Sequence, residues 1–115
     1  MWFDERVLRN IDLNSLLTFM MVYREKNVSR AAHHLGVTQP AVSNVLRDLR
    51  YRFADKLFVH RSRYMEPTSL AVELAALLGP ALYLIQTSLE LRLSDPGLVD
   101  HYISVSRNKF GTQFV

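Results

Sequence analysis

Apolar residues recur at three- and four-residue steps along most of this sequence, and that spacing predicts a mainly α-helical protein. The clearest case lies within residues 38–49. Its apolar positions share one side of a helix and are Val42, Val45, Leu46 and Leu49. Thr38 is a good N-cap, because its hydroxyl can accept a hydrogen bond from the first turn. Pro40 falls in that turn, where its missing N–H costs no helical hydrogen bond.

The other side of this helix is polar and carries Gln39, Ser43, Arg47 and Arg50. An α-helix fits the major groove of DNA, where glutamine pairs with adenine edges, arginine with guanine edges or phosphate, and serine with either. A short helix with an apolar back and such a front is typical of DNA recognition. The pattern therefore predicts a recognition helix.

Two further helices are predicted upstream of the recognition helix. The first covers about 13–25, with Asp12 or Asn14 as its N-cap. The second has Ser29 as its cap candidate and stops at Gly36, since glycine just past a helix is the usual left-handed stop. One residue then separates Gly36 from the cap of the recognition helix. So tight a turn favours a helix-turn-helix, and the alternative is a generic three-helix core.

Two short strands are predicted after the recognition helix. Residues 57–60 are apolar, and residues 64–67 can pair back with them. The connecting tip is Arg61-Ser62-Arg63. A hairpin tipped by two arginines suits a wing that presses on phosphates or enters the narrow minor groove. The alternative is a connecting loop with exposed arginines.

A long helix is predicted from Ser69 to about Arg92, with Thr68 as its cap. The positions expected to form a dimer interface are Leu70, Leu74, Leu77, Leu78, Ala81, Leu82, Ile85 and Leu89. This surface is more than a domain of about 60 residues can cover, so a second subunit is the expected cover. Gly79-Pro80 favours a kink near residue 77 or 78. The alternative is an ordinary core helix.

Charge is distributed unevenly along the chain, although the formal net charge is only +3. Nine bases and three acids lie between Arg24 and Arg63, which leaves +6 there. One base and five acids follow between Tyr64 and Asp100, which leaves −4. A polyanionic partner for the first block is expected, the alternative being a solvated basic surface.

The composition narrows the class of protein further. The chain has no cysteine, which excludes disulfides and zinc-thiolate sites and fits a reducing cytoplasm. The acidic residues Asp4 and Glu5 stand where an export signal needs bases. No run of about 18 uninterrupted apolar residues occurs, so we expect no membrane span.

The four histidines do not have the spacing of a metal site, and we expect no metal. His33 and His34 are adjacent and project about 100° apart on a helix, so they cannot share an ion as an i, i+4 pair does. The sequence contains no glycine-rich phosphate loop, nucleophile elbow or paired acids with an evident pocket. We therefore expect that the protein is not an enzyme.

Several of these motifs together resemble the LysR-type transcriptional regulators. They are Ser29-Arg30-Ala31-Ala32, Leu35, Thr38-Gln39-Pro40-Ala41-Val42-Ser43, Leu46, Leu49, Leu57-Phe58, Arg61 and Pro67-Thr68. Arg50, Phe53 and Ala54 depart from the commonest pattern, which has Glu, Leu and Gly there, and look more like the branch of the nodulation-gene and leucine-operon regulators. The resemblance spans about residues 12–91.

This resemblance implies a winged helix-turn-helix followed by a long linker helix that dimerises. Residues 1–11 are then an N-terminal extension, 12–67 the DNA-binding domain and 68–92 the linker helix. Residues 93–115 are expected to be a linker and the start of a truncated effector-binding domain. The fragment needs no cofactor, since a small-molecule effector would bind in that missing C-terminal domain.

Resemblance and geometry together imply roles for individual side chains. Those expected to face bases are Gln39, Pro40 and Ser43. Those expected to touch phosphate or to cap a helix are Ser29, Arg30, Thr38, Arg47, Arg50 and Arg52. Arg61, Ser62 and Arg63 form the expected wing.

The function predicted from these features is sequence-specific binding of double-stranded DNA. The protein is expected to bind an inverted-repeat operator as a homodimer, in the bacterial cytoplasm and associated with the nucleoid. The alternative is a helical dimerisation or protein-interaction module with an incidental basic face.

Overall fold

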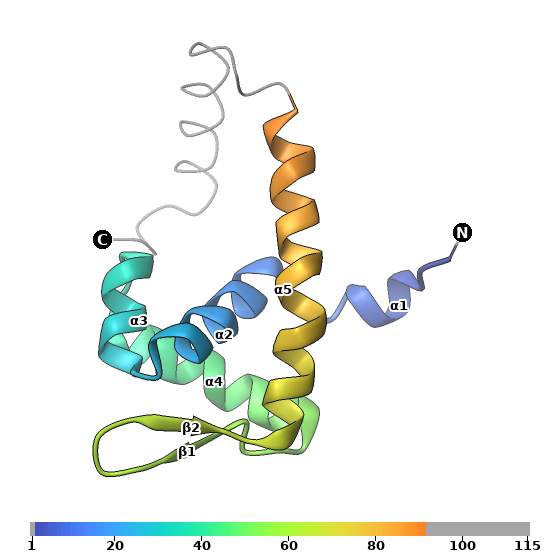
Figure 1. Ribbon diagram of the computed structural model, residues 1–115. Coiled ribbons are helices and arrows are strands. Elements are labelled where there is room, and N and C mark those ends of the chain that lie inside the picture. Colours follow the sequence, from blue (N-terminus) through green and yellow to red (C-terminus); the bar gives the residue numbers. More distant parts are fainter. Residues whose placement is uncertain (1, 92–115) are drawn as a thin grey trace.

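The computed structural model describes residues 2–91, and in this part of the chain five helices and one hairpin follow in sequence (Figure 1). Their bounds are α1 Glu5–Leu8, α2 Leu13–Glu25, α3 Val28–Leu35, α4 Gln39–Phe53, β1 Phe58–His60, β2 Met65–Pro67 and α5 Ser69–Glu90. Helices α2, α3 and α4 pack on one another, the hairpin lies below them, and α5 rises away from the hairpin past α2. This mainly helical arrangement with a small wing is the predicted fold.

The helix starts follow from side chains that satisfy free backbone N–H groups. Asp12 accepts from Ser15 N at the start of α2, and Thr38 accepts from Ala41 N at the start of α4. The short helix α1 was not predicted. It is exposed along its whole length and lies outside the packed domain (Figure 1).

The predicted cap of α3 was wrong. Asn27, not Ser29, occupies the N-cap position, and its side-chain oxygen lies 2.9 Å from Arg30 N. Lys26 before it adopts the left-handed conformation with φ 55° and turns the chain from α2 into α3. Helix α3 therefore starts one residue before Ser29, whose hydroxyl is left available for another contact.

The core lies where α2, α3 and α4 meet the hairpin and the first half of α5. Its buried apolar residues are Phe19, Val22, Ala31, Ala32, Val42, Leu46, Leu49, Leu57, Phe58, Met65, Ala71 and Ala75. Burying a large apolar side chain contributes about 1.5–3 kcal/mol, and this cluster contains five such side chains that are almost fully buried. The periodic stripe read from α4 thus faces inward, and its polar side faces out.

The hairpin is antiparallel and pairs Phe58 with Pro67 and His60 with Met65. Leu57 was expected in the first strand, but it lies outside it, with φ 63° and no exposed surface. Asp55 explains this geometry, since its Oδ2 accepts from both Leu57 N and Thr68 Oγ1 at 2.7 Å. The carboxylate thus joins the end of α4, the start of the hairpin and the cap of α5.

Helix α5 begins where predicted, with Thr68 Oγ1 accepting from Ala71 N. It continues through Pro80 without interruption as far as Glu90, with Leu91 as its C-cap, and residue 92 of the predicted span lies outside the described residues. By length and composition alone α5 could cross a membrane, with mean hydropathy 1.5 over 18 residues of which 11% are buried. Its first half nevertheless packs on α2 and β2, as a helix of a folded domain does.

Candidate nucleic-acid interface

The polar face of α4 is left open by the packing of the domain. Gln39, Ser43 and Arg47 are exposed, and Arg50 is half-buried, whereas the apolar stripe behind them is covered. The α-helical period of about 100° per residue accounts for this division, because the exposed side chains fall within about 80° of one another. The outer face of α4 is therefore accessible to a partner along its first three turns.

A groove of about 530 Å³ lies between this face and the hairpin, and we call it the basic groove. Its polar lining comes from the α2–α3 turn, α3, α4 and the hairpin, and consists of Lys26, Asn27, Ser29, Gln39, Ser43, Arg50, His60, Ser62, Arg63 and Tyr64. Among the described residues that line the groove, none is acidic. Positive charge and polar side chains from four elements thus converge on one concave surface, which suits a polyanion.

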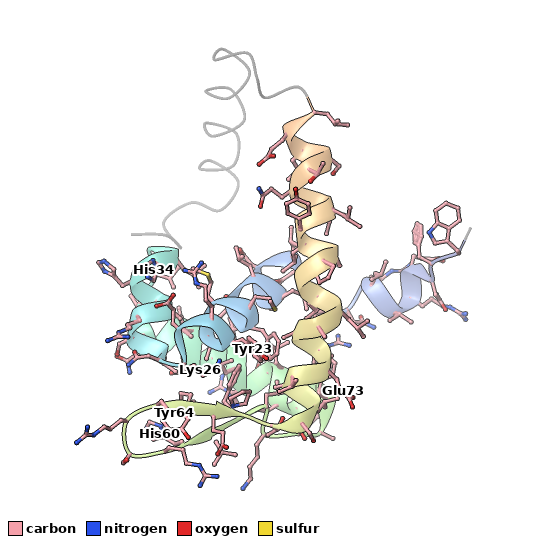
Figure 2. The ribbon with its side chains drawn as sticks, in the orientation of Figure 1. Tyr23, Lys26, His34, His60, Tyr64 and Glu73 are labelled. Atoms are coloured by element: carbon pink, nitrogen blue, oxygen red, sulfur yellow. The ribbon has the colours of Figure 1, made fainter. Side chains whose placement is uncertain are left out.

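Four of these lining residues had no predicted role, namely Lys26, Asn27, His60 and Tyr64. Figure 2 shows Lys26 above the hairpin that carries His60 and Tyr64. A backbone hydrogen bond from Met65 N to Lys26 O, 2.9 Å long, holds the α2–α3 turn against the hairpin. The basic charge of Lys26 placed it in the basic block of the sequence. No local pattern indicated this backbone contact, because the two segments lie far apart in the chain.

Two of the arginines predicted to contact phosphate from α4 already donate hydrogen bonds within the protein. Arg50 Nε donates to Lys56 O at 2.9 Å, which fixes that side chain at the rim of the groove. Arg52 lies apart from the groove, about 220° around the helix from Gln39, and donates to Asn10 O. Arg52 therefore joins α4 to the segment before α2, and its expected phosphate role has no geometric support.

The wing arginines are also unequal. Arg61 is bound by Glu66 on the facing strand, with its Nε and Nη2 both 2.6 Å from Glu66 Oε2. Arg63 lines the basic groove, whereas Arg61 does not. The charge of Arg61 is therefore partly neutralised by Glu66, whereas Arg63 offers its charge to the basic groove. The sequence alone did not distinguish the two arginines.

One acidic side chain of α2 has a shifted pKa. The Arg24 guanidinium, 2.8 Å from Glu25 Oε2, holds the pKa of Glu25 below its ordinary value, and His34 adds to this at 3.5 Å. Glu25 thus stays ionised and is satisfied by bases outside the basic groove. Glu25 does not line the basic groove, so its carboxylate does not neutralise a cation there.

A second groove, of about 790 Å³, runs between α2 and the second half of α5, and we call it the apolar groove. Its apolar lining includes Leu13, Leu17, Met20, Met21, Leu82, Ile85 and Leu89. The positions predicted for a dimer interface differ in their surroundings here, because Leu70, Leu74 and Leu78 pack against the core of their own domain. Positions on the same face further along, beyond the end of that core, are not covered by any of residues 2–91.

The sequence matches the family model of bacterial regulatory helix-turn-helix proteins of the lysR family over residues 13–71. The chain belongs to the LysR family. The matched region contains α2, α3, α4, the hairpin and the start of α5. The helix-turn-helix inferred from the spacing of α3 and α4 is thus the DNA-binding domain of this family.

Relatives of this chain include a protein named LeuO and a nodulation protein, in agreement with the expected branch of the family. LeuO of Escherichia coli strain K12 is 46% identical over 71% of this chain and 26% of its own length. NagR of a Ralstonia species is 48% identical over 77% and 30%, and nodulation protein D 1 of Bradyrhizobium elkanii 35% identical over 90% and 33%. LeuO and NagR are named as transcriptional regulators. The chain thus spans about a quarter to a third of the length of these relatives.

Solved structures share the fold. A probable transcriptional regulator of Pseudomonas aeruginosa, PA0477, matches with a TM-score of 0.70 and 40% identity over 74% of this chain and 28% of that protein. The DNA-binding domain of BenM, in its complex with the catB site 1 DNA, matches with a TM-score of 0.67 and 21% identity over 70% and 90%. At that identity the second likeness shows the fold alone.

Proposed function

We propose that this chain binds double-stranded DNA in a sequence-specific manner and as a homodimer. In this proposal α4 enters the major groove, with Gln39, Pro40 and Ser43 toward the base edges. The hairpin tip, Arg61 to Arg63, lies on the adjacent backbone or in the minor groove. This is the DNA-binding part of a bacterial regulator.

The observation that carries the proposal is the basic groove. Its lining joins the polar face of a recognition helix to a wing, and no acid among the described residues interrupts it. The phosphate contacts we propose are Arg30, Thr38, Arg47, Arg50, Arg61 and Arg63, with Lys26 added from the structure. The BenM domain, which has this fold, has been solved bound to DNA, and this supports the proposal.

The homodimer is proposed from the second half of α5 and the apolar groove beside it. A second copy of α5 is the natural occupant, because the groove is apolar and the exposed part of the helix is apolar on the same face. Two recognition helices in such a dimer would reach successive major grooves, about 34 Å apart, of an inverted repeat.

The remaining parts of the proposal follow from this activity. A DNA-binding regulator acts in the cytoplasm at the nucleoid and catalyses no reaction. It needs no cofactor to bind DNA. An effector domain of the kind that LysR-type regulators carry would bind a small molecule beyond the residues described here.

The first test selects bound sequences from a random DNA pool and compares the parent with Gln39→Ala. We expect the variant to lose about 1–3 kcal/mol of discrimination between the selected site and random duplex, because a base-edge contact is removed. Asn10→Ala is the matched control, since it removes an exposed amide side chain in the segment before α2, which does not line the basic groove. An unchanged ratio of specific to random affinity in Gln39→Ala would refute the base-reading role.

A second candidate function is a protein-interaction module that works through α5, and the exposed apolar groove favours it. Titration of a labelled duplex at two salt concentrations separates the two functions. DNA binding should weaken steeply as salt rises, because each phosphate contact releases counterions. An interaction module would bind duplex poorly at either concentration.

A further inference from the structure

Ser29 and Gln39, both predicted to contact DNA, form a hydrogen bond with each other through their side chains. Ser29 Oγ, on α3, donates to Gln39 Oε1, in the first turn of α4, across 3.0 Å. Both side chains are exposed and both line the basic groove. Because Asn27 caps α3, the Ser29 hydroxyl is free to make this contact. The turn of the helix-turn-helix thus brings the two residues together from ten positions apart.

The bond determines which atoms Gln39 can offer. A carboxamide has one acceptor oxygen with two lone pairs and an NH₂ group with two donors. Ser29 uses one of these lone pairs from the α3 side, so Gln39 keeps both of its N–H donors but only one acceptor lone pair for the groove. The side chain then acts chiefly as a hydrogen-bond donor.

Base edges differ in the hydrogen-bond donors and acceptors that they present to such a side chain. A glutamine that reads adenine uses both ends, accepting from N6 while donating to N7. Guanine offers two acceptors, N7 and O6, and thymine offers O4, so either is satisfied by donors alone. A glutamine whose oxygen already accepts one hydrogen bond and is held toward α3 therefore favours guanine or thymine over adenine at its contact position.

We propose that Ser29 is a positioning residue that sets the base preference of Gln39 by engaging its side-chain oxygen. This inference rests on the proposed function, since it needs Gln39 to face a base. It replaces the predicted adenine pairing with a preference for acceptor-rich edges. It also assigns Ser29 a role other than the helix cap or phosphate contact expected from the sequence.

The test is a selection from a random DNA pool with the parent, Ser29→Ala and Ser29→Thr. The parent should enrich guanine or thymine at the position that becomes degenerate in Gln39→Ala. Ser29→Ala frees the oxygen, so adenine relative to guanine should rise there by about tenfold, within the range of one bidentate base contact. Ser29→Thr keeps the hydroxyl donor and should retain the parent's preference.

Two controls separate this effect from a structural one. The melting temperature of Ser29→Ala should equal the parent's, because Asn27 and not Ser29 caps the helix. Ser29→Ala in the Gln39→Ala background should leave the base preference unchanged, because the oxygen it acts on is gone.

The opposite outcomes are equally specific. If Ser29→Ala weakens all duplexes alike with the parent's base preference retained, Ser29 is a phosphate contact and the inference is overturned. An adenine preference in the parent overturns it as well. A parent that enriches no sequence at all defeats the proposed function, and the role of Ser29 with it.

Discussion

At the scale of single residues, Ala54 is held in a conformation that its side chain disfavours. It ends α4 with φ 50°, and its N–H closes the helix on Arg50 O and Tyr51 O. The left-handed region costs a non-glycine residue about 1–2 kcal/mol. Glycine adopts this conformation without such a cost, so the residue type at position 54 has an energetic consequence.

Ala54→Gly should therefore raise the free energy of unfolding by about 1 kcal/mol, the relief of strain less the entropy that glycine adds to the unfolded chain. Urea denaturation measures the change. Ala76→Gly is the matched control, since this exposed alanine lies inside α5, where glycine should lower the free energy by about 1 kcal/mol. Equal losses in both variants would show that Ala54 is unstrained.

Residue patterns predicted some local features and missed others. Thr38 and Thr68 were recognised as caps, and Asp12 as one of two candidates with Asn14, because a cap depends only on neighbours within the same turn. Asn27 and Ser29 are both good caps, and only the course of the chain after Lys26 decided between them. The Ser29–Gln39 contact depends on how α3 crosses α4, which no local pattern specifies.

At the scale of elements, the hairpin carries an ion pair that changes how the wing presents its charge. Arg61 and Glu66 face each other across the strands, and both side chains remain about half exposed. An exposed pair of this kind contributes little stability, so its effect is on charge. A phosphate must compete with Glu66 for Arg61, whereas Arg63 has no such acid within the basic groove.

Arg61→Ala should weaken binding to all duplexes alike and flatten the plot of log affinity against log salt by about one unit, because one phosphate contact is lost. Glu66→Gln is the informative partner variant. It releases Arg61 without removing a cation and should strengthen binding to specific and random duplexes equally, most clearly at low salt. A Glu66→Gln variant with the parent's affinity would mean that Arg61 does not contact DNA.

At the scale of the whole molecule, α5 uses one face for two purposes. Ala71, Ala75 and Leu78 turn that face into their own domain, and Leu82, Ile85 and Leu89 continue it past the end of the core. Figure 1 shows the second half of α5 standing clear of the helices below it. A face that starts in a core and runs out into solvent suits a second copy of the chain.

Ile85→Asp should convert the dimer to a monomer, because it places a charge in the apolar groove that we propose as the interface. Sedimentation equilibrium of the chain checks this outcome. Thr87→Asp adds the same charge about 160° around the helix and should leave the dimer intact. Ile85 is 40% exposed and lies beyond the core, so the variant should keep its circular dichroism spectrum.

Dimerisation should also raise the affinity for DNA that carries two half-sites. A monomeric Ile85→Asp chain should bind a single half-site as the parent does and lose the gain in affinity from a second half-site. A variant that stays dimeric would place the interface elsewhere on the molecule.

The sequence by itself determined helices α2 to α5, the turn between α3 and α4, the wing and the family, because periodicity, caps and glycine stops act over a few residues. Tertiary structure alone decided the rest. It packed Leu70, Leu74 and Leu78 against the core of their own domain, used Arg52 to hold Asn10 and bound Arg61 to Glu66. It also brought Lys26 and His60 into one groove, because the surroundings of a side chain depend on segments that are distant in the chain.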